Sequence, residues 1–260
     1  MTQACPDAFI ALAERLAEAS GPVVRHYFRT ELDVEAKQDA SPVTIADREA
    51  EAAMRVLVEQ VYPEHGIFGE EHGFVRTDAE YAWVLDPIDG TKAFVTGMPI
   101  FGTLIAVMRD GAPILGIIDQ PVLGERWIGA AGRPTTLNGA PAHTQEAARL
   151  SSARHYATHP DMFVHGDDRA KVDGLIAQVR QSRYGGDCYA YGLLASGHID
   201  LITDACMQIY DFMALVPVIE GAGGVVTDWD GAPLTRESDG HVLAAANRTL
   251  HGEALAILRG

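Results

Sequence analysis

The sequence predicts an α+β fold for this chain. Two stretches with apolar residues at helical spacing come first, and short, partly β-branched strands joined by tight turns follow them. In the second half, helical and extended stretches alternate along the chain. These features together predict a largely antiparallel sheet with two helices, followed by a second sheet that is covered by helices of its own.

Length and composition are those of an ordinary globular protein. The chain has 260 residues, of which 47% are hydrophobic and 22% charged, and its formal net charge is −16. This acidity argues against a nucleic-acid partner, because binding a phosphate backbone needs clustered Lys and Arg, and it suits a protein that binds divalent cations. Three cysteines without a CxxC pair, no export signal and no membrane-length apolar run lead us to expect a cytoplasmic protein with reduced thiols.

The first half should contain two helices and the antiparallel sheet. Residues 10–27 form an amphipathic helix that Gly21-Pro22 should kink or split, and residues 44–61 form a second helix. A buried strand over residues 82–85 should stop at Pro87, because proline cannot donate to a sheet ladder. Further strands are predicted at residues 66–71, where the strand ends in two acids, and at 102–108, 114–119 and 125–130, with tight turns at 110–111, 123–124 and 138–139.

The second half should add a sheet that is covered by helices. The helices are predicted at residues 171–181, 189–195, 211–222 and 250–258, and the strands at residues 183–186, 199–203, 225–228 and 242–246. Because no Ser/Gly-rich linker separates the halves, residues 1–140 and 141–260 should share a core as one compact unit.

The stretch that carries the strongest chemical signal begins at Asp86. An apolar strand delivers Asp86 at its end, and Asp89 follows three residues later. Gly90 permits backbone conformations that side chains forbid, so the amides of Gly90 and Thr91 can point toward an anion. Two carboxylates beside free amides suit a site that holds hard cations and a phosphate together.

Other positions can complete a metal site. Glu70 and Asp211 each lie at the end of a predicted strand or the start of a predicted helix, where acids gather at one edge of a fold. The backbone carbonyl of Ile88 can also join a coordination shell, because Mg²⁺ prefers oxygen ligands. Asp47 lies in the first turn of the second helix, where a capping role is the favoured interpretation from the residues alone.

Several motifs give the chain a family resemblance. The motifs Gly69-Glu70-Glu71, Asp86-Pro87-Ile88-Asp89-Gly90-Thr91 and Tyr210-Asp211, the last with Glu220-Gly221-Ala222-Gly223-Gly224, occur in the order found in the inositol monophosphatase family of metal-dependent phosphatases. The likeness covers nearly the whole chain, although that family's usual Trp-Asp pair reads Tyr210-Asp211 here. The runs Gly116-Ile117-Ile118-Asp119-Gln120-Pro121 and Tyr184-Gly185-Gly186-Asp187-Cys188-Tyr189 resemble its histidinol-phosphatase branch.

The resemblance implies a five-layered α/β/α/β/α sandwich, a homodimer and two to three Mg²⁺ ions per subunit. It implies that Glu70, Asp86, Asp89, Asp211 and the Ile88 carbonyl hold the metals. Thr91, paired with Asp47 and assisted by Thr44, would orient and deprotonate a metal-activated water. Glu71 would support the metal ligands without binding the metal itself. Lys37 lies in the loop that closes over the metals in the family, with an ordinary solvated lysine as the equal alternative.

Substrate choice rests on a few side chains. Histidinol phosphate carries an ammonium and an imidazole, so its site should offer carboxylates. The resemblance places Asp187 and Asp204 toward the substrate, and a helix N-cap is the alternative for Asp187. Asp204 stands where Glu is more usual. Glu125 and Trp127 would meet the imidazole, in their own site or in the partner's, with an exposed strand pair as the alternative.

Three functions therefore remain open. The first is hydrolysis of histidinol phosphate by a Mg²⁺-dependent enzyme of histidine biosynthesis. The second keeps this chemistry but acts on inositol phosphate or a nucleotide 3′-phosphate. The third is a regulatory binding protein on the same scaffold, which the complete set of acidic ligands disfavours.

Overall fold

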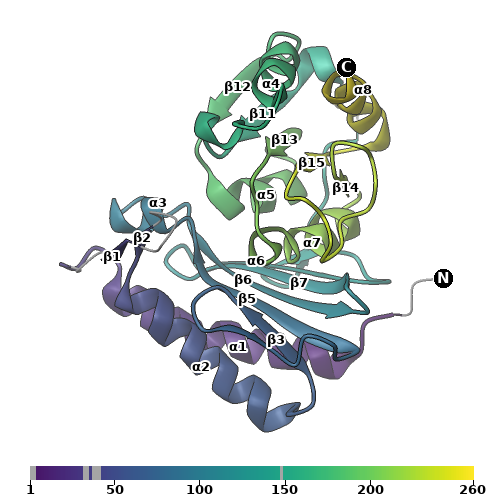
Figure 1. Ribbon diagram of the computed structural model, residues 1–260. Coiled ribbons are helices and arrows are strands. Elements are labelled where there is room, and N and C mark those ends of the chain that lie inside the picture. Colours follow the sequence, from purple (N-terminus) through teal and green to yellow (C-terminus); the bar gives the residue numbers. More distant parts are fainter. Residues whose placement is uncertain (1–3, 32–34, 37–41, 147–148) are drawn as a thin grey trace.

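The computed structural model describes residues 4–31, 35–36, 42–146 and 149–260. Its helices and sheets form five stacked layers (Figure 1), in the order helix pair, sheet, helices, sheet, helix pair. The predicted α+β class and the layered sandwich are therefore confirmed. Lys37 lies outside the described residues, so its role stays a prediction.

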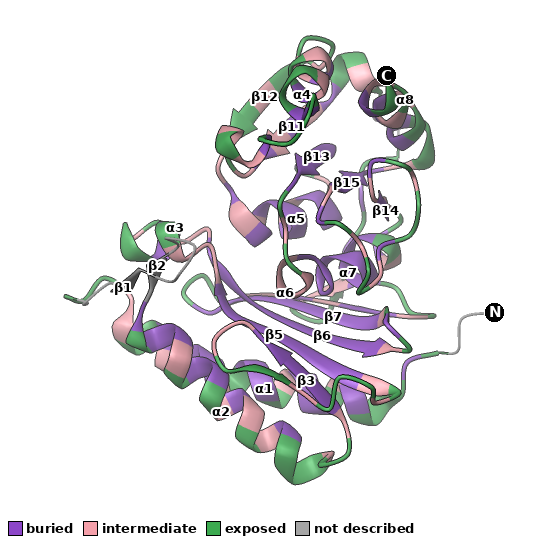
Figure 2. Cartoon of the chain, viewed as in Figure 1, coloured by how far each residue is buried: buried purple, intermediate pink, exposed green. Residues whose placement is uncertain are grey.

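The first layer consists of the helices α1 (Asp7–Tyr27) and α2 (Ile45–Val61). Each presents one apolar stripe, which packs against the first sheet, and leaves its polar face exposed (Figure 2). The expected split at Gly21-Pro22 is wrong, because α1 continues through Pro22 as one helix and stays buried on both sides of it, at Ser20 and Val24. Packing of this face offsets the lost backbone hydrogen bond.

The first sheet has the strand order β10-β9-β8-β7-β6-β5-β3-β4 and is antiparallel except for the β3–β5 pair. The turns at residues 110–111 and 138–139 have positive φ at both positions, as expected for tight hairpins. The strands are β3 (Gly66–Gly69), β4 (Gly73–Val75), β5 (Tyr81–Asp89), β6 (Gly102–Arg109), β7 (Ala112–Gln120), β8 (Glu125–Ala130), β9 (Thr136–Leu137) and β10 (Ala140–Pro141).

Strand β5 does not stop at Pro87, which corrects the sequence-based expectation. It runs on to Asp89 with a register shift between Asp86 and Asp89, so Pro87 occupies an irregular stretch where its missing N–H costs no ladder bond. The Thr103 hydroxyl of β6 donates to the Pro87 carbonyl at 2.8 Å and bridges this stretch. The irregularity brings two acids three residues apart to one end of the strand.

The middle layer contains α5 (Asp187–Ala195), α6 (Ile209–Phe212) and α7 (Leu215–Gly221). The single helix predicted over residues 211–222 is divided into α6 and α7, and Met213 and Ala214 between them keep right-handed helical dihedrals. Helix α7 lies directly against β7 and β8, where added Cβ atoms at Gly116 and Gly129 would meet the carbonyls of Ala214 and Pro217 at 1.9 and 2.2 Å. Glycines in the two strands make this close packing possible.

The second sheet has the order β12-β11-β13-β15-β14 and mixes parallel and antiparallel pairs. The prediction missed β11, placed β12 two residues late and extended α4 too far toward the C-terminus. The strands are β11 (Arg154–Ala157), β12 (Gln181–Tyr184), β13 (Leu201–Asp204), β14 (Val225–Thr227) and β15 (Val242–Ala245), and the last layer consists of α4 (Asp168–Ile176) and α8 (Arg248–Arg259).

Short elements complete the chain. A small two-stranded sheet pairs β1 (Glu35–Ala36) with β2 (Pro42–Val43), and the helix α3 (Thr91–Val95) follows β5. Two 3-10 turns, η1 (Leu150–Ser152) and η2 (Pro160–Met162), flank β11.

One hydrophobic cluster joins the two sheets through the middle layer. It includes Val84 and Leu104 from the first sheet, Leu215 from α7, and Ile202 and Ala244 from the second sheet. Residues from both sheets thus bury apolar surface against each other in this cluster. Among the described residues, none of the helices has both the length and the apolar character needed to cross a bilayer.

Candidate active site

Three carboxylates meet at the end of β5. Oxygen atoms of Asp86, Asp89 and Asp211 all lie within 4.8 Å of one another. The first two come from the irregular end of β5, and Asp211 comes from α6, where it accepts a hydrogen bond from the Gln208 N–H at 2.7 Å that orients its side chain. The structure thus brings together acids that lie more than 120 residues apart in the sequence.

The electrostatics of this carboxylate cluster fit a divalent cation. Burial raises the pKa of Asp86 well above its usual value, and the charges of Glu70, Asp89 and Asp211 raise it further. Burial, and then the charge of Asp187, also raises the pKa of Asp89. Crowded carboxylates in a poorly solvated place repel one another, and a bound Mg²⁺ or similar hard cation would relieve that repulsion.

Glu70 belongs to the same cluster. It follows β3, where its N–H donates to the Leu85 carbonyl at 3.1 Å and so continues the pairing with β5. Its carboxyl group hydrogen-bonds to that of Asp86. The four predicted acidic ligands therefore converge, as the sequence-based hypothesis required, and their action on a metal remains a proposal.

The turn after β5 links the cluster to Thr91. The Ile88 N–H donates to Asp86 Oδ1 at 3.0 Å, and the Thr91 hydroxyl donates to the Ile88 carbonyl at 3.1 Å. Gly90 has a φ of 86°, and a Cβ there would lie 2.8 Å from the Asp187 carboxyl carbon. Both the left-handed backbone and the close approach of Asp187 therefore require glycine at this position.

Asp47 caps α2 and also faces Thr91. Its Oδ2 accepts hydrogen bonds from the Thr44 N–H at 2.8 Å and the Thr44 hydroxyl at 2.6 Å, which caps α2. Its Oδ1 faces the Thr91 hydroxyl at 3.4 Å. Burial raises the pKa of Asp47 above its usual value. A carboxylate with a raised pKa suits a proton acceptor beside the carboxylate cluster.

A cleft of about 50 Å³ opens beside the carboxylate cluster. Asp187 lies in it at the start of α5, with a φ of 43°, and the N-cap is Gly186, so the capping alternative for Asp187 is wrong. The Cys188 N–H donates to Asp89 Oδ2 at 2.7 Å and ties α5 to the cluster. The cleft is lined by Asp89, Thr158, Met162, Asp187, Cys188, Tyr191, Met207, Asp211 and Leu215.

Two predicted substrate residues are buried instead. Trp127 is 1% exposed and its indole N–H donates to the Ser196 hydroxyl at 2.8 Å, so the predicted imidazole contact is wrong in this fold. Asp204 is fully buried, and its carboxylate accepts hydrogen bonds from the Thr158 N–H, the Thr158 hydroxyl and the Tyr191 hydroxyl. It therefore orients two residues of the cleft lining and does not face a substrate.

Glu125 keeps a place near the surface. It begins β8, is half-buried, and its Oε2 accepts a hydrogen bond from the Tyr189 hydroxyl at 2.5 Å. A contact of Glu125 with substrate stays a prediction. Glu71 lies in the turn after β3, and its supporting role also stays a prediction.

Local sequence patterns did not indicate Thr158, Tyr191 or the buried Glu51 as site residues. Thr158 and Tyr191 meet only through the pairing of β11 with β13 and the packing of α5, which no local pattern reveals. The local pattern at Glu51 indicates an ion pair, since it lies four residues before Arg55 at ion-pair spacing on a helix.

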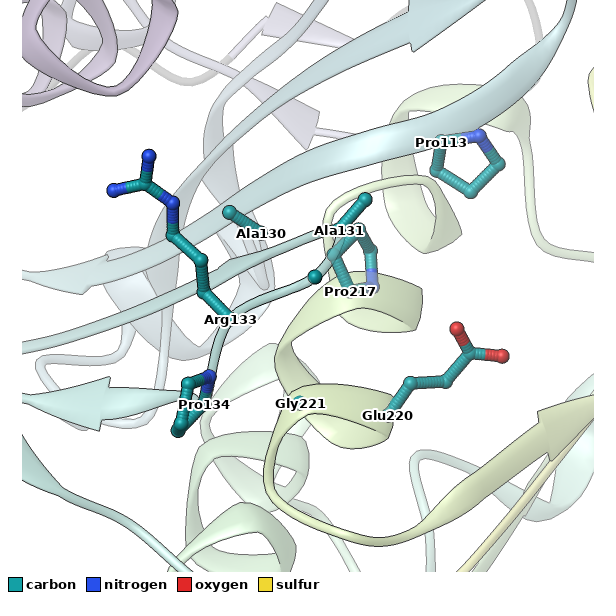
Figure 3. Close-up of a pocket in the computed structure, with 9 residues that line it drawn as sticks. Pro113, Ala130, Ala131, Arg133, Pro134, Pro217, Glu220 and Gly221 are labelled. Carbon is teal, nitrogen blue, oxygen red and sulfur yellow. The ribbon is translucent and has the colours of Figure 1, made fainter. Parts of the chain in front are cut away.

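A larger cavity of about 520 Å³ lies at the start of β7 and the end of β8, away from the carboxylate cluster (Figure 3). Its lining is mostly backbone and small apolar side chains such as Pro113, Ala131 and Pro217, and the two charged groups, Arg133 and Glu220, extend away from each other. It lacks the convergent acids and hydroxyls of the smaller cleft. Chemistry rather than size therefore places the candidate site at the carboxylate cluster.

Known proteins resemble this chain over nearly its full length. Residues 6–260 match the model of the inositol monophosphatase family. The bifunctional phosphatase IMPL2 of Arabidopsis thaliana, a chloroplastic protein, is 49% identical over 97% of this chain and 75% of its own length. The histidinol-phosphatase of Chlorobaculum parvum is 35% identical over 96% of both chains.

A solved structure also has the same fold. An inositol monophosphatase from Zymomonas mobilis is 46% identical, covers 98% of both chains and superposes with a TM-score of 0.90. The family match, the identities and the shared architecture agree with the carboxylate cluster described above. The chain belongs to the inositol monophosphatase family, whose members are phosphatases of small phosphorylated compounds.

Proposed function

We propose that this phosphatase converts L-histidinol phosphate into L-histidinol and inorganic phosphate, as a step of histidine biosynthesis. The observation that carries the proposal is the position of Asp187, whose carboxylate borders the cleft beside Asp89. A carboxylate there suits a substrate with an ammonium group close to its phosphoester. The relatives named as histidinol-phosphatases support the same choice.

The residues of the site have separate roles in this proposal. Glu70, Asp86, Asp89, Asp211 and the Ile88 carbonyl would hold Mg²⁺ ions, which supply charge neutralisation for the phosphate and the leaving oxygen. Thr91 orients the attacking water through its hydroxyl. Asp47, whose pKa is raised by burial, accepts the proton through Thr91. The amides of Gly90 and Thr91 remain the proposed contacts for the phosphate.

A panel of substrates tests the proposal. Phosphate release is measured from L-histidinol phosphate, inositol 1-phosphate and a nucleoside 3′-phosphate, each with Mg²⁺ and with a chelator. We expect the highest kcat/KM for histidinol phosphate and loss of activity with the chelator. A higher kcat/KM for either other substrate would overturn the assignment of substrate but not the phosphatase chemistry.

Asp187→Asn sharpens the test. We expect kcat/KM for histidinol phosphate to fall about 10- to 100-fold, as for a lost charge-assisted hydrogen bond, with a smaller change for inositol 1-phosphate. Asp161→Asn is the matched control, because Asp161 is an exposed acid next to Met162 of the cleft. An equal loss on both substrates in the Asp187 variant would argue against recognition of the ammonium.

The second candidate is inositol monophosphatase activity, which the 46% identical solved inositol monophosphatase favours. The substrate panel separates the two. A regulatory binding role without catalysis would require the purified protein to release no phosphate with any metal. A cytoplasmic location and a homodimer complete the proposal.

A further inference from the structure

Glu51 is a buried carboxylate outside the carboxylate cluster. It lies in the middle of α2 and is 0% exposed. Three donors converge on it: the Glu71 N–H on Oε2 at 2.7 Å, and the His72 N–H and Arg55 Nη1 on Oε1 at 3.2 and 2.9 Å. A buried carboxylate lowers stability unless it is hydrogen-bonded in this way. Two of the three donors are backbone N–H groups of the turn after β3, so Glu51 binds that turn.

Helix α2 holds that whole turn. Arg55 Nη1 also donates to the Gly73 carbonyl at 2.9 Å, and the His72 Nε2 atom lies 3.0 Å from the Arg48 carbonyl. Glu51 is the central contact, because its carboxylate accepts from two successive backbone N–H groups of the turn, those of Glu71 and His72.

Glu70 lies immediately before the residues that Glu51 holds. Its own N–H is fixed by the Leu85 carbonyl, and the next N–H, that of Glu71, is fixed by Glu51. The peptide units on both sides of Glu70 are thus held in place, and the Glu70 carboxyl group reaches Asp86.

Gly69 shows how closely the strand approaches Glu51. A Cβ at this position would lie 2.0 Å from Glu51 Oε1 and 2.6 Å from its carboxyl carbon. Gly69 does not have a positive φ, so the requirement here is space. The glycine of the Gly69-Glu70-Glu71 motif therefore makes room for the Glu51 carboxylate.

We propose that Glu51 is a positioning residue that fixes Glu70 in the carboxylate cluster, so that loss of the Glu51 carboxylate weakens binding of a divalent cation there. The inference rests on the proposed metal-dependent function.

The first experiment measures metal affinity in Glu51→Gln. The amide keeps the size of the side chain but replaces one acceptor oxygen by a donor that faces the backbone N–H groups. Mn²⁺ is the probe, with its Kd measured by calorimetry or by electron paramagnetic resonance, and the Mg²⁺ concentration for half-maximal activity is measured in parallel. We expect both to rise about 10- to 100-fold, as for other residues that support metal ligands.

Two controls separate positioning from stability. Met54→Ala removes a fully buried side chain from the same helix, so it should lower the Tm and leave the Mn²⁺ Kd unchanged. Glu59→Gln removes a partly exposed charge of the same helix, paired with Arg76, and should change neither quantity.

A double-mutant cycle provides the second test. Gly69→Ala should weaken Mn²⁺ binding in the presence of Glu51, because the new methyl group displaces the carboxylate. The same substitution in the Glu51→Ala background should add little, since the remaining close neighbour, Arg55 Nη1 at 2.7 Å from the added Cβ, is the far end of a flexible side chain. Such non-additivity is expected only for residues in direct contact.

The outcomes distinguish this inference from the proposed function. Wild-type Mn²⁺ affinity in Glu51→Gln, or additive effects in the cycle, would overturn the positioning role while phosphatase activity persisted. A wild-type protein that binds Mn²⁺ but hydrolyses no phosphomonoester would overturn the function, and weaker Mn²⁺ binding in Glu51→Gln would still support the role of Glu51.

Discussion

Thr91 is the residue on which the proposed proton transfer depends. Its hydroxyl lies between the Ile88 carbonyl and Asp47 Oδ1, and only a hydroxyl at this place can both donate to the carboxylate and accept from a water. Thr91→Val should lower kcat about 10²- to 10⁴-fold, with Tm nearly unchanged because the shape is kept. Thr91→Ser is the matched control and should retain most of the activity. A fully active valine variant would exclude Thr91 from the reaction.

The Asp89 carboxylate is needed for the proposed activity, but its burial destabilises the metal-free protein at high pH. Its pKa is raised in the folded protein, so the folded state binds more protons than the unfolded state, and without metal this group favours folding at low pH and opposes it as pH rises through the folded pKa. Asp89→Asn should therefore raise the Tm of the metal-free protein most at pH 8 and abolish activity. Thermal scans with a chelator from pH 5 to 8 measure the effect. Asp78→Asn, at an exposed position, should change neither property.

The predictability of the site differs from residue to residue. Asp86, Asp89 and Thr91 could be proposed from the sequence because a local motif carries their chemistry. Trp127 and Asp204 were misjudged because their burial depends on how α5 packs onto β8 and β13, which is a property of contacts distant in sequence.

At the level of elements, His155 joins three strands of the second sheet. Its Nδ1 lies 2.8 Å from the Ser182 hydroxyl of β12, and its Nε2 lies 2.8 Å from the Thr203 hydroxyl of β13. Burial lowers the pKa of His155 to about 4, below its value in the unfolded chain. The neutral ring therefore stabilises the fold above pH 6.5, and this contribution is lost as pH falls toward 4, by roughly 3 kcal/mol in total.

His155→Gln tests this. The difference in unfolding free energy between wild type and variant should shrink as pH falls from 6.5 to 4, because glutamine does not titrate. His159→Gln, at an exposed position, should leave the pH profile as in wild type. A difference that stays constant over this pH range would contradict the assignment.

Elements with a strong local pattern were predicted well, and those that depend on neighbours were not. The two long helices and the hairpins of the first sheet follow from periodicity and turn residues. Strand β11 reads Arg-His-Tyr-Ala and lacks an apolar run, so only its parallel pairing with β12 and β13 makes it a strand. The division between α6 and α7 lies four residues before Pro217, whose missing N–H cannot bond the Met213 carbonyl, so the sequence carried a local signal for it.

For the whole molecule, a metal ion in the carboxylate cluster would join two layers. Asp86 and Asp89 come from the first sheet and Asp211 from the middle layer. Mg²⁺ that binds only the folded state should stabilise it by about 2.7 kcal/mol at a concentration of 100 times its Kd. Thermal unfolding with Mg²⁺ and with a chelator should therefore differ in Tm. Asp211→Asn should reduce this difference strongly, and an unchanged difference would place the metal elsewhere.

The irregular end of β5 has a further consequence for how this protein can change over time. In a regular strand, neighbours three apart face opposite sides, so removing the irregularity would send Asp86 and Asp89 in opposite directions. The number of residues between Asp86 and Asp89 is therefore constrained more tightly than the identity of those residues. Shortening this segment by a single residue would shift Gly90 and Thr91 relative to the carboxylate cluster and should abolish phosphate release, whereas the exposed stretch around Glu237 should accept insertions. A change of substrate would then come from substitutions of residues that line the cleft, while the length of the segment at the end of β5 stays the same.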